Sequence, residues 1–152
     1  MRFLGTCVAL LACVFTATTA QANGERIGWQ NNYARAYEQA VRTQRPLVIK
    51  FTAPGCEQCE KLQTETLVDE TVVKLIEDRY VALELDAERD AELISKFRVD
   101  SFPATLVVTP ERQIVKRIQG YQSAASMAYE LTSTLPENRK APTPSYNFRG
   151  SS

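Results

Sequence analysis

The chain has 152 residues, a length that suits one globular domain. Lysine and arginine together number 18, aspartate and glutamate also number 18, and histidine is absent. The balanced charge leaves no basic excess to neutralise phosphates, which argues against nucleic-acid binding driven by charge. Without histidine the chain excludes a Ser-His-Asp triad, a Cys-His nucleophile pair, a histidine-ligated catalytic zinc and a histidine-ligated haem.

Residues 1–22 have the pattern of a secretory signal peptide. Arg2 supplies a short basic start, and a largely apolar run follows over residues 3–15. Ala20-Gln21-Ala22 fits the small-residue pattern that signal peptidase accepts. The apolar run is shorter than the roughly 20 residues of a membrane-spanning helix, so a cleaved signal is the better interpretation.

An alternative interpretation of this segment is a lipoprotein signal, because Leu10-Leu11-Ala12-Cys13 resembles a lipobox. Two apolar residues, Val14 and Phe15, follow Cys13, where a mature lipoprotein usually turns polar. We therefore favour cleavage after Ala22 and export without a lipid anchor at Cys13. Export predicts an oxidising location, either secreted or, for a double-membraned bacterium, periplasmic.

In chain order, the apolar pattern predicts alternating helices and strands. The expected elements are a helix over residues 29–43, a strand over 47–52, a helix over 56–67, a second short helix or continuation over 68–79, a strand over 80–86, a helix with its N-cap at Asp90, strands over 104–109 and 114–119, and a closing helix over 123–135. The last two strands are separated by a hairpin-length turn.

The order of these elements, an N-terminal helix and then βαβαββα, predicts an α/β fold. We expect strands separated by helices to run parallel and the final pair to be antiparallel. The product is a mixed sheet with helices on both faces, a three-layer arrangement over residues 23–135. Residues 136–152 contain three prolines and few apolar residues, so we expect a disordered C-terminal tail.

Cys56-Glu57-Gln58-Cys59 is the reactive motif of the chain. Removal of the signal peptide leaves Cys56 and Cys59 as the cysteines of the mature protein. The motif follows a predicted strand and opens a predicted helix, so the positive end of the helix dipole favours a thiolate at Cys56. Cys59 lies one helical turn further on the same face, within reach for a disulfide. Cys56 is thus the expected exposed nucleophile and Cys59 the expected resolving thiol in thiol–disulfide exchange.

The motif and its surroundings resemble the thioredoxin-fold superfamily, and in particular secreted thioredoxin-like proteins related to the C-terminal domain of the DsbD reductant. The resemblance spans residues 29–135. It rests on the strand over 47–52, the run 53–61 around the two cysteines, Leu67-Val68-Asp69, the run 99–105, and Gly120 after the last strand. It implies a thioredoxin-like fold, a redox-active Cys56–Cys59 dithiol and protein thiols or disulfides as substrates.

The resemblance also implies that Pro103 is a cis-proline that faces the dithiol. In the family, the backbone just before this proline pairs with the substrate chain like an added strand. Phe102 is therefore expected to border the substrate groove. Without the cysteine motif, Pro103 would be interpreted as a simple strand start.

Two residues depart from the family pattern. Many thioredoxins have a buried aspartate six residues before the first cysteine, where this chain has Lys50. A buried cation there would stabilise the reduced form and favour oxidant behaviour, whereas the alternative is that Lys50 directs its ammonium to the surface. Gly55 replaces the usual tryptophan before the first cysteine.

Glu57 and Glu60 have two possible interpretations. Their carboxylates act against a thiolate at Cys56, or they simply form a favourable acidic first turn of the helix.

Two other classes of function compete with redox exchange. The cysteine pair supplies two soft ligands for Cu(I) or zinc, although a structural zinc site needs about four ligands. A linear Cu(I) dithiolate or a zinc site shared by two chains therefore stays open, as does a non-catalytic binding module of thioredoxin fold. A c-type haem is excluded because Glu60, not histidine, follows Cys59. Trp29, Tyr33 and Tyr37 are interpreted as packing residues, not as a ligand cage.

From the residues and the resemblance together, we expect an exported thiol–disulfide oxidoreductase, a reductant or general exchanger rather than an oxidant. A reductant in an oxidising compartment needs a membrane-linked electron donor, and an oxidant needs a matching oxidase. We expect a monomer. We also expect no bound cofactor, because the electrons reside in the dithiol.

Overall fold

The computed structural model describes residues 26–136. The predicted signal peptide, residues 1–22, and residues 137–152 of the predicted tail lie outside the described residues. Over the described range, no helix has both the length and the apolar character needed to span a membrane.

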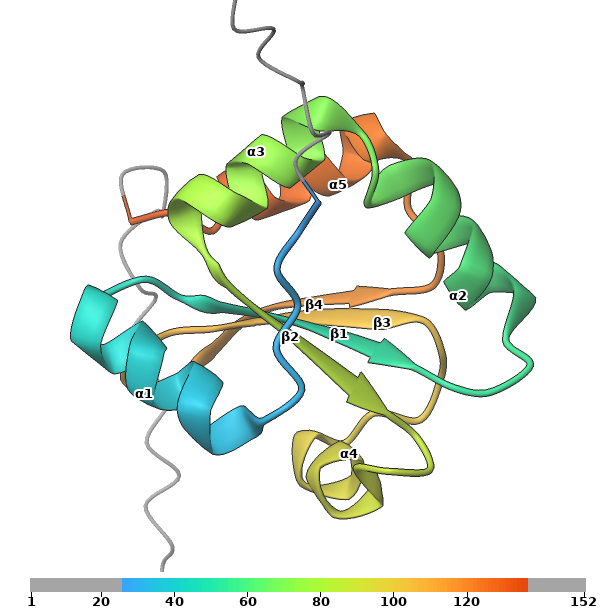
Figure 1. The fold of residues 1–152 in the computed structure, drawn as a ribbon, viewed down its shortest axis with the longest axis horizontal. Helices are drawn as coiled ribbons and strands as arrows, with labels where there is room; N and C mark the ends of the chain where they lie inside the picture. Colours follow the sequence, from blue (N-terminus) through green and yellow to red (C-terminus); the bar gives the residue numbers. More distant parts are fainter. Residues whose placement is uncertain (1–25, 137–152) are drawn as a thin grey trace, which may run out of the picture.

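Helices and strands follow one another along the chain in the predicted order (Figure 1). The α-helices are α1 (Tyr33–Thr43), α2 (Glu57–Lys61), α3 (Glu70–Arg79), α4 (Ala91–Phe97) and α5 (Ala124–Thr132), and α2 continues into a π-helical turn, η1 (Leu62–Thr66). The strands are β1 (Leu47–Thr52), β2 (Val81–Asp86), β3 (Ala104–Val108) and β4 (Ile114–Gln119).

The four strands form one mixed sheet in the order β2-β1-β3-β4. β1 runs parallel to β2, with Leu47 opposite Val81, and antiparallel to β3, which is in turn antiparallel to β4. The prediction that all helix-separated strands run parallel is therefore wrong for β3. The reason is α4, which has seven residues and lies near the carboxyl end of β2 (Figure 1). A helix that spans only about 10 Å does not return the chain along the sheet, so β3 starts where β2 ends.

Each face of the sheet is covered by its own hydrophobic core, which gives the three predicted layers (Figure 1). Successive strand residues point to opposite faces. Ile49 accordingly packs with Ala36 of α1 and Ile94 of α4, whereas Val48 packs with the cluster formed by α3, η1 and α5. These four side chains are all buried.

Side-chain caps explain where three of the helices begin. Asn32 accepts the Arg35 N–H at 3.0 Å, Asp69 accepts the N–H groups of Thr71 and Val72, and Ser123 accepts the Ser126 N–H. Because Asn32 is the cap, α1 starts at Tyr33 and not at the predicted residue 29.

The residues at two predicted helix starts form hydrogen bonds outside their helices. Trp29 precedes α1, because its neighbour Gln30 instead hydrogen-bonds the backbone of β2, with the Gln30 N–H donating to the Ala82 carbonyl at 3.0 Å. Asp90 occupies the N-cap position of α4, but its carboxylate accepts the Asp86 N–H at 2.8 Å and does not cap the helix.

A buried tyrosine joins the end of α3 to the end of α5. The hydroxyl of Tyr80 donates to the Leu131 carbonyl at 2.6 Å and lies 2.7 Å from the Thr134 hydroxyl. Tyr80 is 1% exposed. If its hydroxyl is removed, water therefore cannot reach Leu131 and Thr134 to take the place of that hydroxyl.

We therefore expect Tyr80→Phe to lower the free energy of unfolding by about 1–2 kcal/mol, measured by urea denaturation. Tyr129→Phe is the matched control, because Tyr129 lies on α5 and is 74% exposed. Its effect should stay within about 0.5 kcal/mol. Equal losses in the two variants would contradict the role given to the buried hydroxyl.

Candidate functional site

A short loop carries the chain from β1 to the two cysteines. Gly55 has a φ of 69°, in the left-handed region that glycine adopts without a Cβ penalty. The Cys56 N–H donates to the Ala53 carbonyl at 3.3 Å and closes this loop. The glycine before the first cysteine, noted as a departure from the family pattern, thus has a conformational reason.

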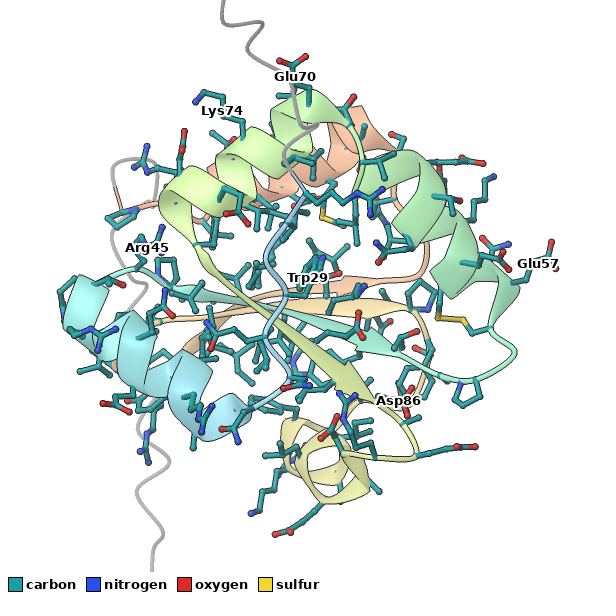
Figure 2. The ribbon with its side chains drawn as sticks, viewed as in Figure 1. Trp29, Arg45, Glu57, Glu70, Lys74 and Asp86 are labelled. Carbon is teal, nitrogen blue, oxygen red and sulfur yellow. A yellow bond between two sulfur atoms is a disulfide. The ribbon has the colours of Figure 1, made fainter. Side chains whose placement is uncertain are left out.

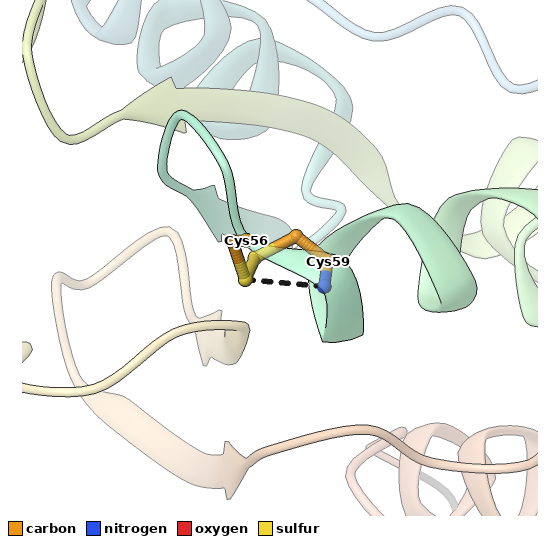
Figure 3. The surroundings of a disulfide bond; sticks show 2 residues. All are labelled: Cys56 and Cys59. Carbon is orange, nitrogen blue, oxygen red and sulfur yellow. Dashed lines mark hydrogen bonds between the residues drawn. A yellow bond between two sulfur atoms is a disulfide. The ribbon is translucent and has the colours of Figure 1, made fainter.

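Cys56 and Cys59 form a disulfide at the start of α2, with their Cα atoms 5.2 Å apart (Figure 3). Cys56 is the N-cap, and its Sγ accepts the Cys59 N–H at 3.2 Å. Cys56 is half-buried, whereas Cys59 is 7% exposed, so an incoming group meets the Cys56 sulfur first. A backbone N–H aimed at this sulfur stabilises a thiolate there after reduction. The assignment of Cys56 as nucleophile and Cys59 as resolving thiol stays a prediction.

Pro103 lies at the end of the sheet from which the cysteine loop departs. The Phe102–Pro103 peptide bond is cis. Ala104 pairs with Phe51 in the sheet, which sets Pro103 beside the last residue of β1. Pro103 is buried, and Phe102 packs against the core shared by α1 and α4. The role of these two residues in a substrate groove stays a prediction.

Lys50 is buried and does not reach the surface. It is 5% exposed, and its Nζ lies 2.6 Å from Oε2 of Glu84. It also donates a hydrogen bond to Gln63 and lies 4.7 Å from the ring centroid of Trp29. The alternative in which Lys50 extends into solvent is therefore wrong, and the ammonium is held by three side chains from different segments.

Glu84 is a site residue that the sequence analysis did not identify. It stands opposite Lys50 in the parallel register of β1 and β2, so its carboxylate neutralises the buried ammonium. A cation that is paired in this way acts on a nearby thiolate less than a lone cation would. The alternating pattern of β2 predicts which face of the sheet Glu84 occupies. It does not predict that Glu84 lies opposite Lys50, because the register between two strands is not encoded by neighbouring residues.

A cavity of about 560 Å³ opens beside the disulfide on the side of β1 and β2. The residues that line it are Trp29, Lys50, Thr52, Ala53, Gly55, Cys56, Glu57, Cys59, Glu60, Gln63 and Glu84. Pro103 precedes β3, on the other side of β1, and does not line this cavity. The cavity with Lys50 and Glu84 thus lies on the β2 side of β1, whereas Pro103 lies on the β3 side.

The aromatic residues of the N-terminal region pack as predicted. Trp29 packs against the core of α3 and α5 and also forms a wall of the cavity. The rings of Tyr33 and Tyr37 stack at 6.0 Å, and Tyr33 meets Phe97 edge-on at 5.7 Å. Burial raises the pKa of the Tyr33 phenol above its usual value, which keeps the hydroxyl neutral.

Within residues 26–136, no three His, Cys, Asp or Glu side chains come together as a group that could hold a metal ion. The two cysteines themselves are joined in the disulfide. This arrangement fits thiol–disulfide exchange, in which the disulfide is broken and formed again. Cys56 is the more accessible residue, and the sulfur of the nearly buried Cys59 is bonded to it.

The comparisons with known proteins agree with this geometry. The family model of the thioredoxin-like domain matches residues 33–134. Thioredoxin of Mycobacterium tuberculosis is 31% identical over 103 residues, which cover 63% of this chain and 79% of that protein.

Two solved structures illustrate the likeness of fold. A thioredoxin from Thermus thermophilus matches with a TM-score of 0.67 and 24% identity, over 74% of this chain and 89% of that one. The oxidised C-terminal domain of DsbD from Neisseria meningitidis matches with a TM-score of 0.59 and 18% identity, over 73% of this chain and 99% of that one. The predicted thioredoxin-like fold is confirmed.

The buried ion pair makes a prediction about stability. Glu84→Gln leaves the Lys50 ammonium buried without its carboxylate and should lower the free energy of unfolding by about 2–3 kcal/mol. Lys50→Met keeps an unbranched side chain of similar size and lets Glu84, 34% exposed, turn to water, so its cost should be about 1 kcal/mol. Urea denaturation of the oxidised proteins at one pH measures both, and a larger loss for Lys50→Met would refute the buried-cation account.

The exposure of the two sulfurs predicts different trapping by serine variants. Cys59→Ser should accumulate mixed disulfides between Cys56 and oxidised protein substrates, because the resolving thiol is absent. Cys56→Ser should accumulate few, since the Cys59 sulfur is nearly buried. Non-reducing electrophoresis and mass spectrometry measure the adducts. Equal trapping by the two variants would contradict the assigned roles.

Proposed function

Because the chain belongs to the thioredoxin-like family of thiol–disulfide oxidoreductases, we propose that it exchanges disulfides with exported proteins through Cys56 and Cys59. The observation that carries this proposal is the disulfide itself, which lies at the start of α2 with its outer sulfur accessible. Export rests on the signal-like pattern of residues 1–22, and the compartment that it implies is the periplasm or the extracellular space.

The proposed reduction of a substrate proceeds in two exchange steps. The Cys56 thiolate attacks one sulfur of the substrate disulfide, which forms a mixed disulfide and releases the other substrate sulfur as a thiolate. The Cys59 thiol then loses its proton to solvent, and its thiolate attacks the Cys56 sulfur. The second substrate thiolate leaves, and two electrons have moved from the dithiol to the substrate. Oxidation of a substrate follows the same steps in reverse.

The substrate chain is proposed to lie on the Pro103 side of the disulfide. Pro103 stands at the end of the sheet next to the last residue of β1, and Cys56 follows that residue after a short loop. An extended substrate segment beside Phe102 would form backbone hydrogen bonds like an added strand. Such binding requires no side-chain recognition, which suits an enzyme that acts on several proteins.

We favour a reductant or general exchanger over an oxidant. The oxidant interpretation rests on a buried cation at Lys50, and the pairing of this ammonium with Glu84 weakens its effect on a thiolate. A reductant in an oxidising compartment draws its electrons from a membrane-linked donor protein, which is the partner we propose. The dithiol holds both electrons, so the proposed enzyme functions without a bound cofactor. We propose that it acts as a monomer.

The reduction potential of the Cys56–Cys59 pair tests this proposal. Metal-free protein is equilibrated in redox buffers, and the thiols are counted from the mass shift after alkylation. A value near about −270 mV supports a reductant, and a value near about −120 mV supports an oxidant and overturns the favoured direction. If no reversible disulfide forms, exchange chemistry itself is refuted. The Cys59→Ser variant is the control for single-thiol adducts.

A further inference from the structure

The cavity on the Lys50 side of the disulfide has no role in the exchange steps described above. The proposed substrate backbone lies towards Pro103, whereas the cavity opens on the other side of β1. Cys56 nevertheless lines it, so a side chain next to a reacting substrate sulfur has access to this space. Its volume of about 560 Å³ lies within the range of cavities that hold small organic groups.

The charges around this cavity do not balance. The ammonium of Lys50 is neutralised inside the protein by Glu84, at 2.6 Å. Glu57 and Glu60, both exposed on α2, also line the cavity. Among the salt bridges of the described residues, neither carboxylate has a partner. Two negative charges therefore remain beside the Cys56 sulfur.

The nearest basic side chain in sequence forms no salt bridge with either carboxylate. Lys61, the last residue of α2, places its ammonium 4.5 Å from the ring centroid of Tyr121. Of the described residues that line the cavity, Lys50 alone is basic. Glu57 projects from the outer end of α2 into solvent (Figure 2), so a charged group that approaches Cys56 passes close to it.

We propose that Glu57 and Glu60 select substrates with a positively charged group beside the sulfur to be exchanged, such as protein cysteines flanked by lysine or arginine. This inference rests on the proposed exchange function and names its substrate class. A cation on the substrate is attracted to the two carboxylates, and it also offsets the negative charge shared by the three sulfurs during exchange. An anionic group at the same place is repelled by the same carboxylates.

A set of three small disulfides isolates this effect from the rest of the substrate. Cystamine carries one ammonium beside each sulfur, bis(2-hydroxyethyl) disulfide is neutral, and 3,3′-dithiodipropionate carries carboxylates. The rate at which each oxidises the reduced protein is divided by its rate with a neutral free thiol, which removes the intrinsic reactivity of the probe. We expect cystamine to exceed the neutral probe by about fivefold at low salt and the dianion to fall below it.

The variants are chosen so that the fold is kept. Glu57→Gln with Glu60→Gln removes both charges from exposed positions and should bring the three normalised rates together. Glu70→Gln is the matched control, because it removes one exposed carboxylate from the start of α3, away from Glu57 (Figure 2), and should leave the preference unchanged. High salt should weaken the preference in the unmodified chain, because exposed charges are screened.

Two results separate failure of this inference from failure of the proposed function. If all three probes oxidise the protein but the double variant keeps the same order of rates, the charge selection by Glu57 and Glu60 is refuted and exchange stands. If none of the probes oxidises the reduced protein while each reacts with the free thiol, the exchange function is refuted as well.

Discussion

The position of β1 between two partner strands sets the geometry of the whole site. Because β1 is hydrogen-bonded on both edges, its residues are held in register with β2 on one side and β3 on the other. The pairing with β2 puts Lys50 opposite Glu84, and the pairing with β3 puts Ala104 opposite Phe51. The chain that leaves this fixed strand reaches Cys56 after a short loop. The disulfide, Pro103 and the Lys50–Glu84 ion pair therefore all take their positions from β1.

The buried ammonium of Lys50 shows how the fold holds a charge close to a redox centre. Removal of an ammonium from water costs several kcal/mol, and a single partner seldom offsets that cost. Here a carboxylate, an amide and an aromatic ring share the task, from Glu84, Gln63 and Trp29. These partners belong to β2, η1 and the N-terminal segment. The Lys50 ammonium therefore joins β1 to three other segments. These partners offset most of its positive charge, so its effect on the sulfurs is reduced.

The features that could be predicted from the sequence are those encoded by neighbours along the chain. Periodicity predicted the element order, and the position of Cys56 between a strand and a helix predicted the redox motif. Two of the failures depend on residues far apart in sequence. The direction of β3 follows from where the short α4 lies, and the pairing of Lys50 with Glu84 follows from strand register. The start of α1 was missed although Asn32 is a good N-cap residue, because Trp29 fits the apolar spacing by coincidence.

A disulfide that has a charged cavity on the β2 side of β1 and Pro103 on the β3 side can combine broad and selective recognition. Backbone pairing beside Pro103 would accept almost any extended segment, because every residue except proline offers the same N–H and C=O groups. The side towards Lys50 adds a criterion that depends on charge, because Lys50 is already neutralised and Glu57 is not. A long-range charge preference raises the encounter rate of suitable substrates without tight binding. For an enzyme that must release each product before the next exchange, selection by encounter rate is better suited than selection by affinity.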